Sequence, residues 1–194
     1  MESAKPDDLL ETHSDPFKSR CALLVSLLAM VLALASLGGS NASKEATMHN
    51  ILASNAYAFY QAKNIRQTSY KLAADDFQFI LAQEKLSPAT RELVEGKLQS
   101  YKKNIERYES EPDTKEGKKE LMEKARKLEA DRAVAKSRSP WYTYAGSLFQ
   151  IAIVLLTASI LAVNNRLYNA SIGVGVFGAL LMSQALWLWL PITI

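Results

Sequence analysis

The sequence is poor in the side chains from which catalytic and metal sites are built. Its 194 residues include one cysteine and two histidines. Cys21 cannot form an internal disulfide, and neither histidine has a second ligand at the spacing of a metal site. Asp75 and Asp76 are neighbours, so on a helix their carboxylates point about 100° apart and do not converge. We therefore expect no catalytic residues, no metal and no cofactor, and we expect that the protein is not an enzyme.

Charged residues are also missing from three long stretches, at 21–37, 139–165 and 167–194. Apolar runs of about 18 residues or more are typical of transmembrane helices, which excludes a single soluble domain. The pattern predicts three spans, at 21–40, 141–165 and 170–190, with a short loop at 166–169. Aromatic residues that favour the membrane interface mark the second and third spans.

The first apolar run has two interpretations. Ala33-Leu34-Ala35 matches the small-residue cleavage pattern of a signal peptide. The segment 1–20 before it is a polar tail with five acidic and three basic residues. A signal peptide begins with a short basic region, so this long acidic tail favours an uncleaved membrane anchor.

Residues 41–140 show no strand pattern and are interrupted twice. Ser87-Pro88 is typical of an N-cap followed by the first helical residue, and 111–114 contains a second proline. The arms on either side of Ser87 are nearly equal, which predicts an extramembrane antiparallel coiled-coil helical hairpin with its tip near 87–88. The returning arm has a heptad stripe formed by Val94, Leu98, Tyr101, Ile105 and Tyr108.

The outgoing arm is expected to supply the opposing stripe, formed by Ile51, Ala58, Ala62, Ile65, Leu72 and Phe79. Three polar residues interrupt it: Asn55, Ser69 and Asp76. Such residues either fix the register or oligomer number of a coiled coil or face outward from a slightly rotated helix. Both interpretations stay open at this point.

The charge pattern bears on partners and orientation. Residues 41–140 interleave 19 basic with 15 acidic residues, as on a solvated helix surface, so we expect no nucleic-acid partner. Short basic flanks mark the cytoplasmic side, and Lys18, Arg20 and Arg166 share one side of three spans. This predicts a multi-pass protein of the bacterial inner membrane, with a cytoplasmic N-terminus and a periplasmic 41–140 domain. Three bases before the second span argue for the opposite orientation: Arg132, Lys136 and Arg138.

Two regions are candidates for helix packing or assembly. In the third span, small residues recur every four positions, and such residues allow close approach of another membrane helix; they are Ser171, Gly175, Ala179 and Ser183. The stretch 55–66 is dense in aromatic and hydrogen-bonding side chains on all helix faces, as expected for an assembly surface. Its candidate contact residues are Asn55, Tyr57, Phe59, Gln61 and Arg66. No ionisable residue lies deep in a span, which disfavours a pump or carrier.

Three blocks carry a family resemblance: N-A-Y-A-F-Y-Q-A-K-N-I-R from Asn55, S-Y-K-K-N-I-E-R-Y-E from Ser100 and L-F-Q-I-A-I-V-L-L-T-A-S-I-L-A from Leu148. In this order they are similar to the bacterial membrane-protein family catalogued as domain of unknown function 4337, over most of residues 21–190. The family often has tryptophan where this chain has Tyr57, and acidic residues where it has 144–147. The resemblance implies the membrane architecture and brings no known activity.

These observations lead to one functional expectation and two alternatives. We expect a non-enzymatic integral membrane scaffold or assembly protein that associates through its hairpin and its small-residue transmembrane faces. Its partners are membrane lipid and either further copies of itself or the subunits of a larger membrane complex. The alternatives are an accessory subunit of a bioenergetic complex of respiratory, photosynthetic or monooxygenase type, and a channel-like homo-oligomer.

Overall fold

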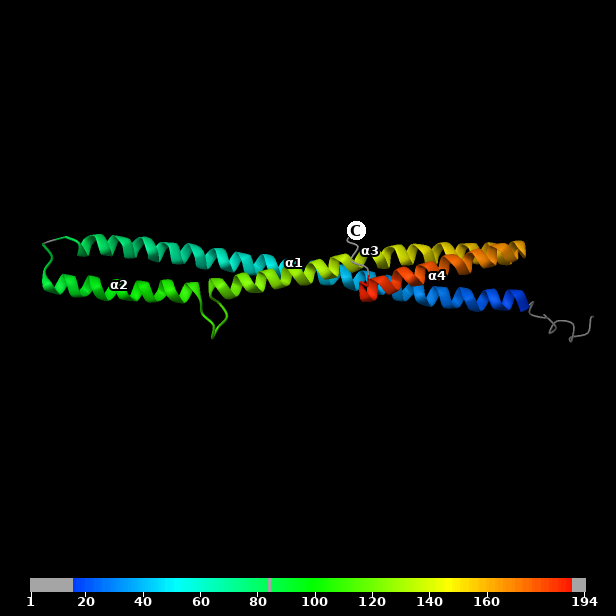
Figure 1. Cartoon of the computed structure of the whole chain (residues 1–194), viewed down its shortest axis with the longest axis horizontal. Helices are drawn as coiled ribbons and strands as arrows, with labels where there is room; N and C mark the ends of the chain where they lie inside the picture. The colour runs from blue at the N-terminus through cyan, green and yellow to red at the C-terminus, as the bar shows by residue number, and fades with distance from the viewer. Residues whose placement is uncertain (1–15, 84, 190–194) are drawn as a thin grey trace, which may run out of the picture. The chain divides into compact units, whose positions relative to one another are not determined.

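The computed structural model describes residues 16–83 and 85–189, and in these residues the chain forms four α-helices and no strand. In chain order they are α1(Pro16–Leu81), α2(Pro88–Glu109), α3(Lys118–Ala162) and α4(Asn165–Trp187) (Figure 1). The predicted all-α class is therefore confirmed. Residues 1–15 of the expected polar tail and residue 190 of the expected third span lie outside the described residues.

The helix α1 does not end where the first apolar run ends. The sequence has no proline between Pro16 and Pro88, so nothing removes a backbone donor from the helix over this length. Gly38 and Gly39 disfavour helix locally, by about 1 kcal/mol each. They are placed where a larger residue would not fit, because a Cβ on Gly38 would collide with the ring of Tyr142.

Polar caps and a turn set the other helix ends. Ser87 is the N-cap of α2, and its hydroxyl accepts a hydrogen bond of 3.2 Å from the Thr90 amide. Asn164 caps α4 in the same way through the Arg166 amide, at 2.9 Å. Between α2 and α3, the chain turns at Lys115, which has a φ of 57°.

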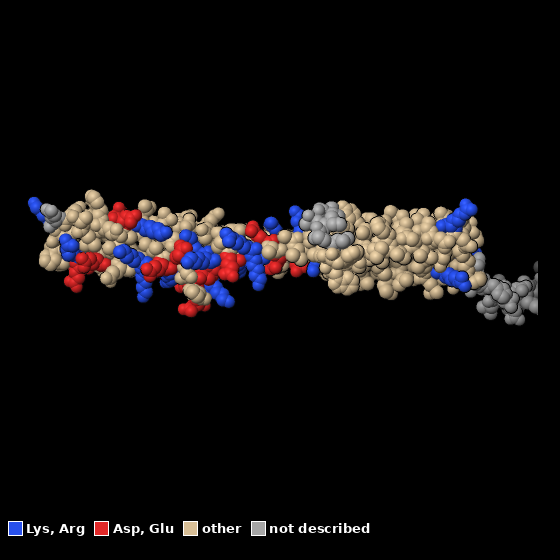
Figure 2. Space-filling view, viewed as in Figure 1, with Lys and Arg blue, Asp and Glu red and all other residues tan. Residues whose placement is uncertain are grey.

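The chain divides into two compact units. One consists of Met1–Lys44 and Ala135–Ile194 and is called here the apolar unit; the other, Glu45–Val134, is called the polar unit. The described residues of the apolar unit include six bases and no acid. In the view of Figure 2, mixed charges gather over the polar unit, whereas the surface of the apolar unit is almost uncharged.

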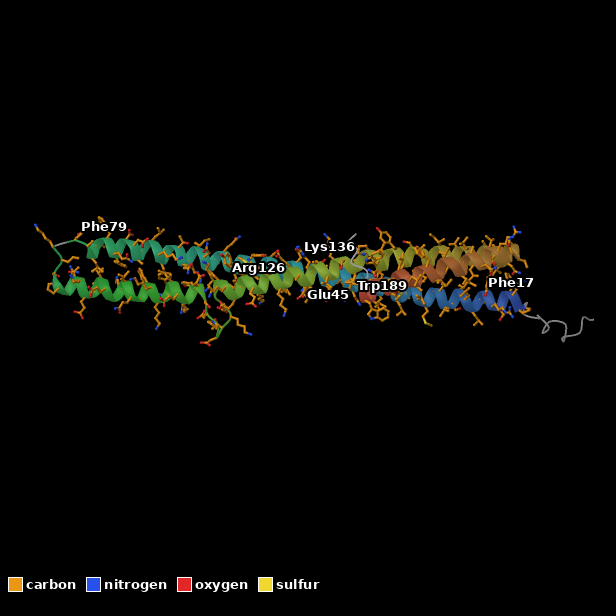
Figure 3. The ribbon with its side chains drawn as sticks, viewed as in Figure 1. Phe17, Glu45, Phe79, Arg126, Lys136 and Trp189 are labelled. Carbon is orange, nitrogen blue, oxygen red and sulfur yellow. The ribbon has the colours of Figure 1, made fainter. Side chains whose placement is uncertain are left out.

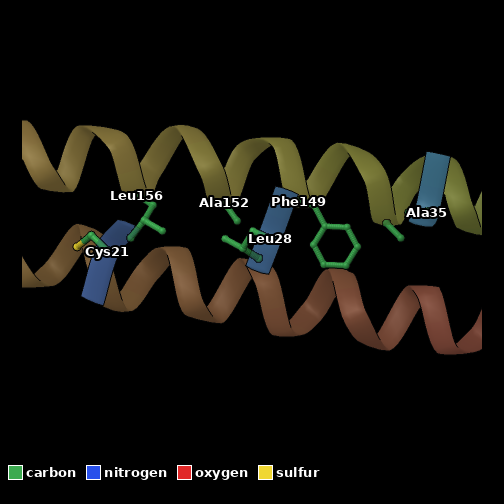
Figure 4. Close-up of a cluster of buried hydrophobic side chains, with 7 residues drawn as sticks. Cys21, Leu28, Ala35, Phe149, Ala152 and Leu156 are labelled. Carbon is green, nitrogen blue, oxygen red and sulfur yellow. The ribbon is translucent and has the colours of Figure 1, made fainter. Parts of the chain in front are cut away.

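The core of the apolar unit is formed by α1, α3 and α4. Its buried residues include Cys21, Leu28 and Ala35 from α1, which face Phe149, Ala152 and Leu156 of α3 (Figure 4). The α4 side chains Val174, Leu181 and Met182 pack against the same cluster. Among the described residues, α1, α3 and α4 are also the three helices long and apolar enough to cross a membrane.

In the polar unit, α1 lies beside α2 and the first part of α3 (Figure 1), with the chain directions opposed. Tyr70 contacts the rings of Tyr101 and Tyr108, with centroids 5.2 and 5.7 Å apart, and Phe77 contacts Tyr101 at 5.4 Å. Nearer the start of the unit, Tyr57 reaches Glu129 of α3.

The predicted stripe of α1 does not face the returning arm, so this prediction is wrong. Its members Ile51, Ile65, Leu72 and Phe79 are exposed, and so are Ala58 and Ala62. The helix carries two stripes at heptad spacing on nearly opposite sides. The stripe that packs inward contains Ala53, Ala56, Tyr60, Gln67, Tyr70, Ala74 and Phe77. Aromatic stacking and the hydrogen bonds of Gln67 select this second stripe for the contact inside the chain.

Candidate assembly surfaces

Two of the small residues of α4 make packing contacts with other helices of the same chain. The Ser171 hydroxyl is buried and donates a hydrogen bond of 2.9 Å to the Ala152 carbonyl on α3. A Cβ on Gly175 would lie 3.1 Å from the Leu28 side chain of α1. Both predicted residues therefore let neighbouring helices of the same chain approach closely.

The inward face of α4 then departs from the predicted spacing of four. Ala179 is exposed, and the Ser183 hydroxyl donates to the Leu180 carbonyl of its own helix at 2.8 Å. The buried positions are instead Gly178, where a Cβ would meet Phe149 at 3.0 Å, Gln184 and Ala185. A step of four residues advances about 40° around a helix, so a strict series of fours leaves the contact line, whereas alternating steps of three and four follow it.

The two ends of the apolar unit both carry basic residues. At one end, the rings of Phe17 and Tyr168 are 5.9 Å apart, which places Lys18, Arg20 and Arg166 in the same region. At the other end, Ala42, Trp141, Tyr142 and Ala185 form a second buried cluster. Lys44, Lys136 and Arg138 flank that cluster in the sequence. Aromatic side chains together with bases are typical of the edges of a membrane-spanning bundle.

Gln67 connects three elements of the polar unit. Its side chain is 1% exposed. Its amide nitrogen donates to the Ile105 carbonyl at 2.9 Å and to Glu109 Oε2 at 3.0 Å, while its amide oxygen accepts from Lys118 Nζ at 2.9 Å. Lys118 also contacts Glu109 Oε2 at 3.3 Å. The hydrogen bond from Gln67, together with Lys118, lowers the pKa of the Glu109 carboxyl. The buried amide thus fixes α1 against both α2 and the start of α3.

The stretch 55–66, predicted as an assembly surface, is divided between two environments. Tyr57 is half-buried, and its hydroxyl donates a 3.0 Å hydrogen bond to Glu129 Oε2 of α3, which raises the pKa of the Tyr57 hydroxyl. Asn55, Phe59, Gln61 and Arg66 are all exposed. Tyr57 therefore holds the polar unit together, whereas the other four residues line its outer surface.

Asn55 lies in a mainly apolar stripe on the outer side of α1, which we call the α1 stripe, and the other three exposed residues border it. Its positions follow alternating steps of three and four: Met48, Ile51, Asn55, Ala58, Ala62, Ile65, Ser69, Leu72, Asp76 and Phe79. Figure 3 shows Phe79 near the end of α1 on the side away from α2. The heptad period predicts these residues as a stripe but does not identify their partner, because periodicity shows that a face is apolar and not what covers it.

A cavity of about 730 Å³ lies beside the α1 stripe. Its lining includes Phe59, Ala62 and Arg66 of α1, and Thr114 and Lys115 of the turn before α3. Lys63 reaches the same turn, 3.9 Å from Glu111 and 3.6 Å from Glu116.

The turn that borders this cavity is closed by Glu120. Its carboxylate accepts from the Ser110 hydroxyl and from the Glu111 amide, and the Ser110 bond lowers the pKa of Glu120. A Cβ on Gly117 would collide with the Glu120 carboxylate and with the Ser110 and Glu111 backbone. One edge of the α1 stripe is therefore bordered by a turn with a defined structure.

Fold and surface together place the chain in a class: all-α proteins with several helices of membrane-spanning length and composition. In residues 16–83 and 85–189 no group of three His, Cys, Asp or Glu side chains is arranged to hold a metal ion. The sequence matches the family described as Domain of unknown function (DUF4337) over residues 17–188, and the chain belongs to this family. The resemblance noted from its three sequence blocks is thereby confirmed. No curated protein and no solved structure matches the chain.

Proposed function

We propose that the protein is a non-enzymatic membrane scaffold. Its apolar unit crosses the bacterial inner membrane with three helices, and its polar unit is an extramembrane helical hairpin that assembles with partner chains. The observation that carries this proposal is the exposed α1 stripe. Large apolar side chains recur along it from Met48 to Phe79, and an extended apolar surface on a polar domain is typical of an interaction site.

Exposed apolar residues on the two units have different explanations. In the apolar unit, Leu23 is 71% exposed and Leu161 is 87% exposed, and lipid chains would cover both. The α1 stripe lies in a unit with 16 basic or acidic side chains between residues 91 and 120 alone, which a membrane interior would not accommodate. Protein is therefore the covering that suits the stripe.

The contacts inside the polar unit hold α1 in a position where its outer side can bind a partner. Gln67, Tyr57 and the stacked Tyr70 hold the inner side of α1 against α2 and α3. This leaves the outer side of a fixed helix for a partner, and a fixed helix loses little conformational entropy on binding.

Orientation is part of the proposal. Lys18, Arg20 and Arg166 flank short polar segments and would face the cytoplasm, and the polar unit would lie in the periplasm. Basic residues occur near both ends of the spans, and those at the two ends favour opposite orientations. The bases next to the 41–140 segment should have less influence, because charges beside a loop of 100 residues affect orientation less than charges in short flanks.

The experiment is a mass measurement of the full chain extracted in mild detergent, by size exclusion with light scattering. The proposal predicts a protein mass well above the 21.5 kDa of one chain. Ile65→Asp should lower this mass because it places a charge in the α1 stripe, whereas Asn64→Asp, its exposed neighbour off the stripe, should not. A wild-type mass of 21.5 kDa, or equal masses for the two variants, would contradict the proposal.

A further inference from the structure

The α1 stripe has the geometry of a coiled-coil surface that lacks its second helix. Its steps of three and four continue from Met48 to Phe79 without a break. In heptad terms, the d positions are occupied by Ile51, Ala58, Ile65, Leu72 and Phe79. The a positions are occupied by Met48, Asn55, Ala62, Ser69 and Asp76. Apolar residues at every d position and mainly small ones at a favour a partner helix that runs alongside the stripe.

We propose that this partner is the α1 helix of a second copy of the chain, parallel to the first and in register with it. The inference rests on the proposed function, because a shared membrane anchor is what orients the copies. Two copies inserted in one membrane with one topology project their α1 helices in the same direction. Parallel pairing then places every residue of the stripe opposite its own counterpart, in an interface with twofold symmetry.

The exposed area is sufficient for such a pair. Six large side chains lie on the stripe or its edge as far as Leu72, and their exposed fractions are 58% for Met48, 55% for Ile51, 38% for Leu52, 64% for Phe59, 67% for Ile65 and 62% for Leu72. A large side chain has about 200 Å² of surface, so together they present about 700 Å². This is about the area that each partner contributes to a standard specific interface.

The polar residues of the stripe are compatible with an identical partner. In a parallel pair, Asn55 lies opposite Asn55, and one carboxamide can donate to the other whichever way the pair is arranged. Ser69 is likewise self-complementary. A single Asn at an a position is a known means of fixing register in parallel coiled coils.

The charges beside the stripe also suit self-association. No Lys, Arg, Asp or Glu occurs from Ala46 to Ala62, so two copies do not repel each other there. Further along, Gln61 at a g position comes beside Arg66 at the following e position of the other copy, and the amide oxygen can accept from the guanidinium. Asp76 at an a position would face its own counterpart, and the two like charges repel each other, so we expect close contact to end near Leu72.

Cysteine crosslinking of the full chain in its native membrane tests the geometry. In a Cys21→Ser background, Ile65→Cys and Leu72→Cys should each form a disulfide-linked dimer on mild oxidation, because d positions bring the Cα atoms within about 7 Å. Asn64→Cys and Lys71→Cys, on the outer face one residue away, should stay at background. A mixture of Met48→Cys and Phe79→Cys chains should give no heterodimer, because only antiparallel helices would bring these ends together.

The outcomes separate this inference from the proposed function. A wild-type mass above one chain combined with background crosslinking at Ile65 and Leu72 would overturn the parallel α1 pair and leave the scaffold proposal standing. A heterodimer of Met48→Cys with Phe79→Cys would replace the parallel arrangement with an antiparallel one and so also overturn it. A single-chain mass would overturn both proposals.

Discussion

Gln67 is the residue whose replacement should weaken the polar unit most for the least change in volume. Gln67→Leu keeps a side chain of similar size but removes the hydrogen bonds to Ile105, Glu109 and Lys118. A hydrogen bond contributes about 1 kcal/mol net, and one to a charged group about 1.5–3 kcal/mol. Lys118 and Glu109 keep their own contact of 3.3 Å, and Glu109 is 43% exposed, so water compensates part of the loss. We therefore expect the free energy of opening of the polar unit to fall by about 2–3 kcal/mol.

Hydrogen exchange of the full chain in lipid nanodiscs measures this change. A loss of that size should speed the exchange of the α2 amides roughly 30- to 150-fold, because about 1.4 kcal/mol corresponds to a factor of ten. Gln78→Ala, an exposed glutamine further along α1, is the matched control and should leave α2 protected. If Gln67→Leu exchanges at the control rate, the buried amide is not what holds α1 against α2.

The same substitution changes the pH dependence. Because Gln67 lowers the pKa of Glu109 in the folded protein, ionised Glu109 adds stability at a pH above its unfolded pKa of about 4.3. This contribution is lost as the pH falls through the lowered folded pKa. In Gln67→Leu the Glu109 pKa should return toward its ordinary value, so α2 protection should depend less on pH between about 5 and 3. An unchanged pH profile would mean that the amide does not set this pKa.

Three further predictions concern other parts of the chain. Gly175→Leu should destabilise the apolar unit by on the order of 1–2 kcal/mol, because a Cβ at this position would already lie 3.1 Å from Leu28. Gly173→Leu is the control and should have less effect, because a Cβ at Gly173 would have nothing within 4 Å. Equal thermal stability of the two variants in detergent would contradict this prediction. Asn55→Leu should strengthen self-association and mix oligomer numbers, because a buried amide specifies one state at a cost in stability, and crosslinked ladders of a single unchanged size would count against it. Trypsin added to spheroplasts should cut first at Lys115 in the exposed turn while Arg166 stays protected; cleavage only after the membrane is broken would reverse the proposed orientation.

Helix breaks and the fold class could be predicted because they depend on local chemistry. Serine is favoured at the N-cap and proline at the first position of a helix, and α2 begins at Pro88 with Ser87 as its cap. The turn between α2 and α3 contains Pro112, and Lys115 in it adopts a left-handed conformation. An apolar stretch of membrane-spanning length likewise lies in each of α1, α3 and α4, because hydropathy and length are properties of the sequence itself.

The inner face of α1 could not be predicted, because the helix has two stripes of the same period. Period alone ranked the apolar Ile65 and Leu72 above Gln67 and Tyr70, yet the latter two face α2. A signal was present in the aromatic residues of α2, since Tyr101 and Tyr108 at heptad spacing favour aromatic partners such as Tyr70 and Phe77. The same limit applies to α4, where Ser171 and Gly175 were found but Gly178 was missed.

Counting the chains of single particles in an intact bilayer tests the central claim most directly. Each chain would carry one fluorophore and be reconstituted in its full length at low density into supported membranes. If the protein is a self-assembling scaffold, most particles should bleach in two or more steps, and Ile65→Asp should shift them to one step while Asn64→Asp leaves them unchanged. Single-step bleaching of the wild-type protein, at the density where a known dimer shows two steps, would contradict the account.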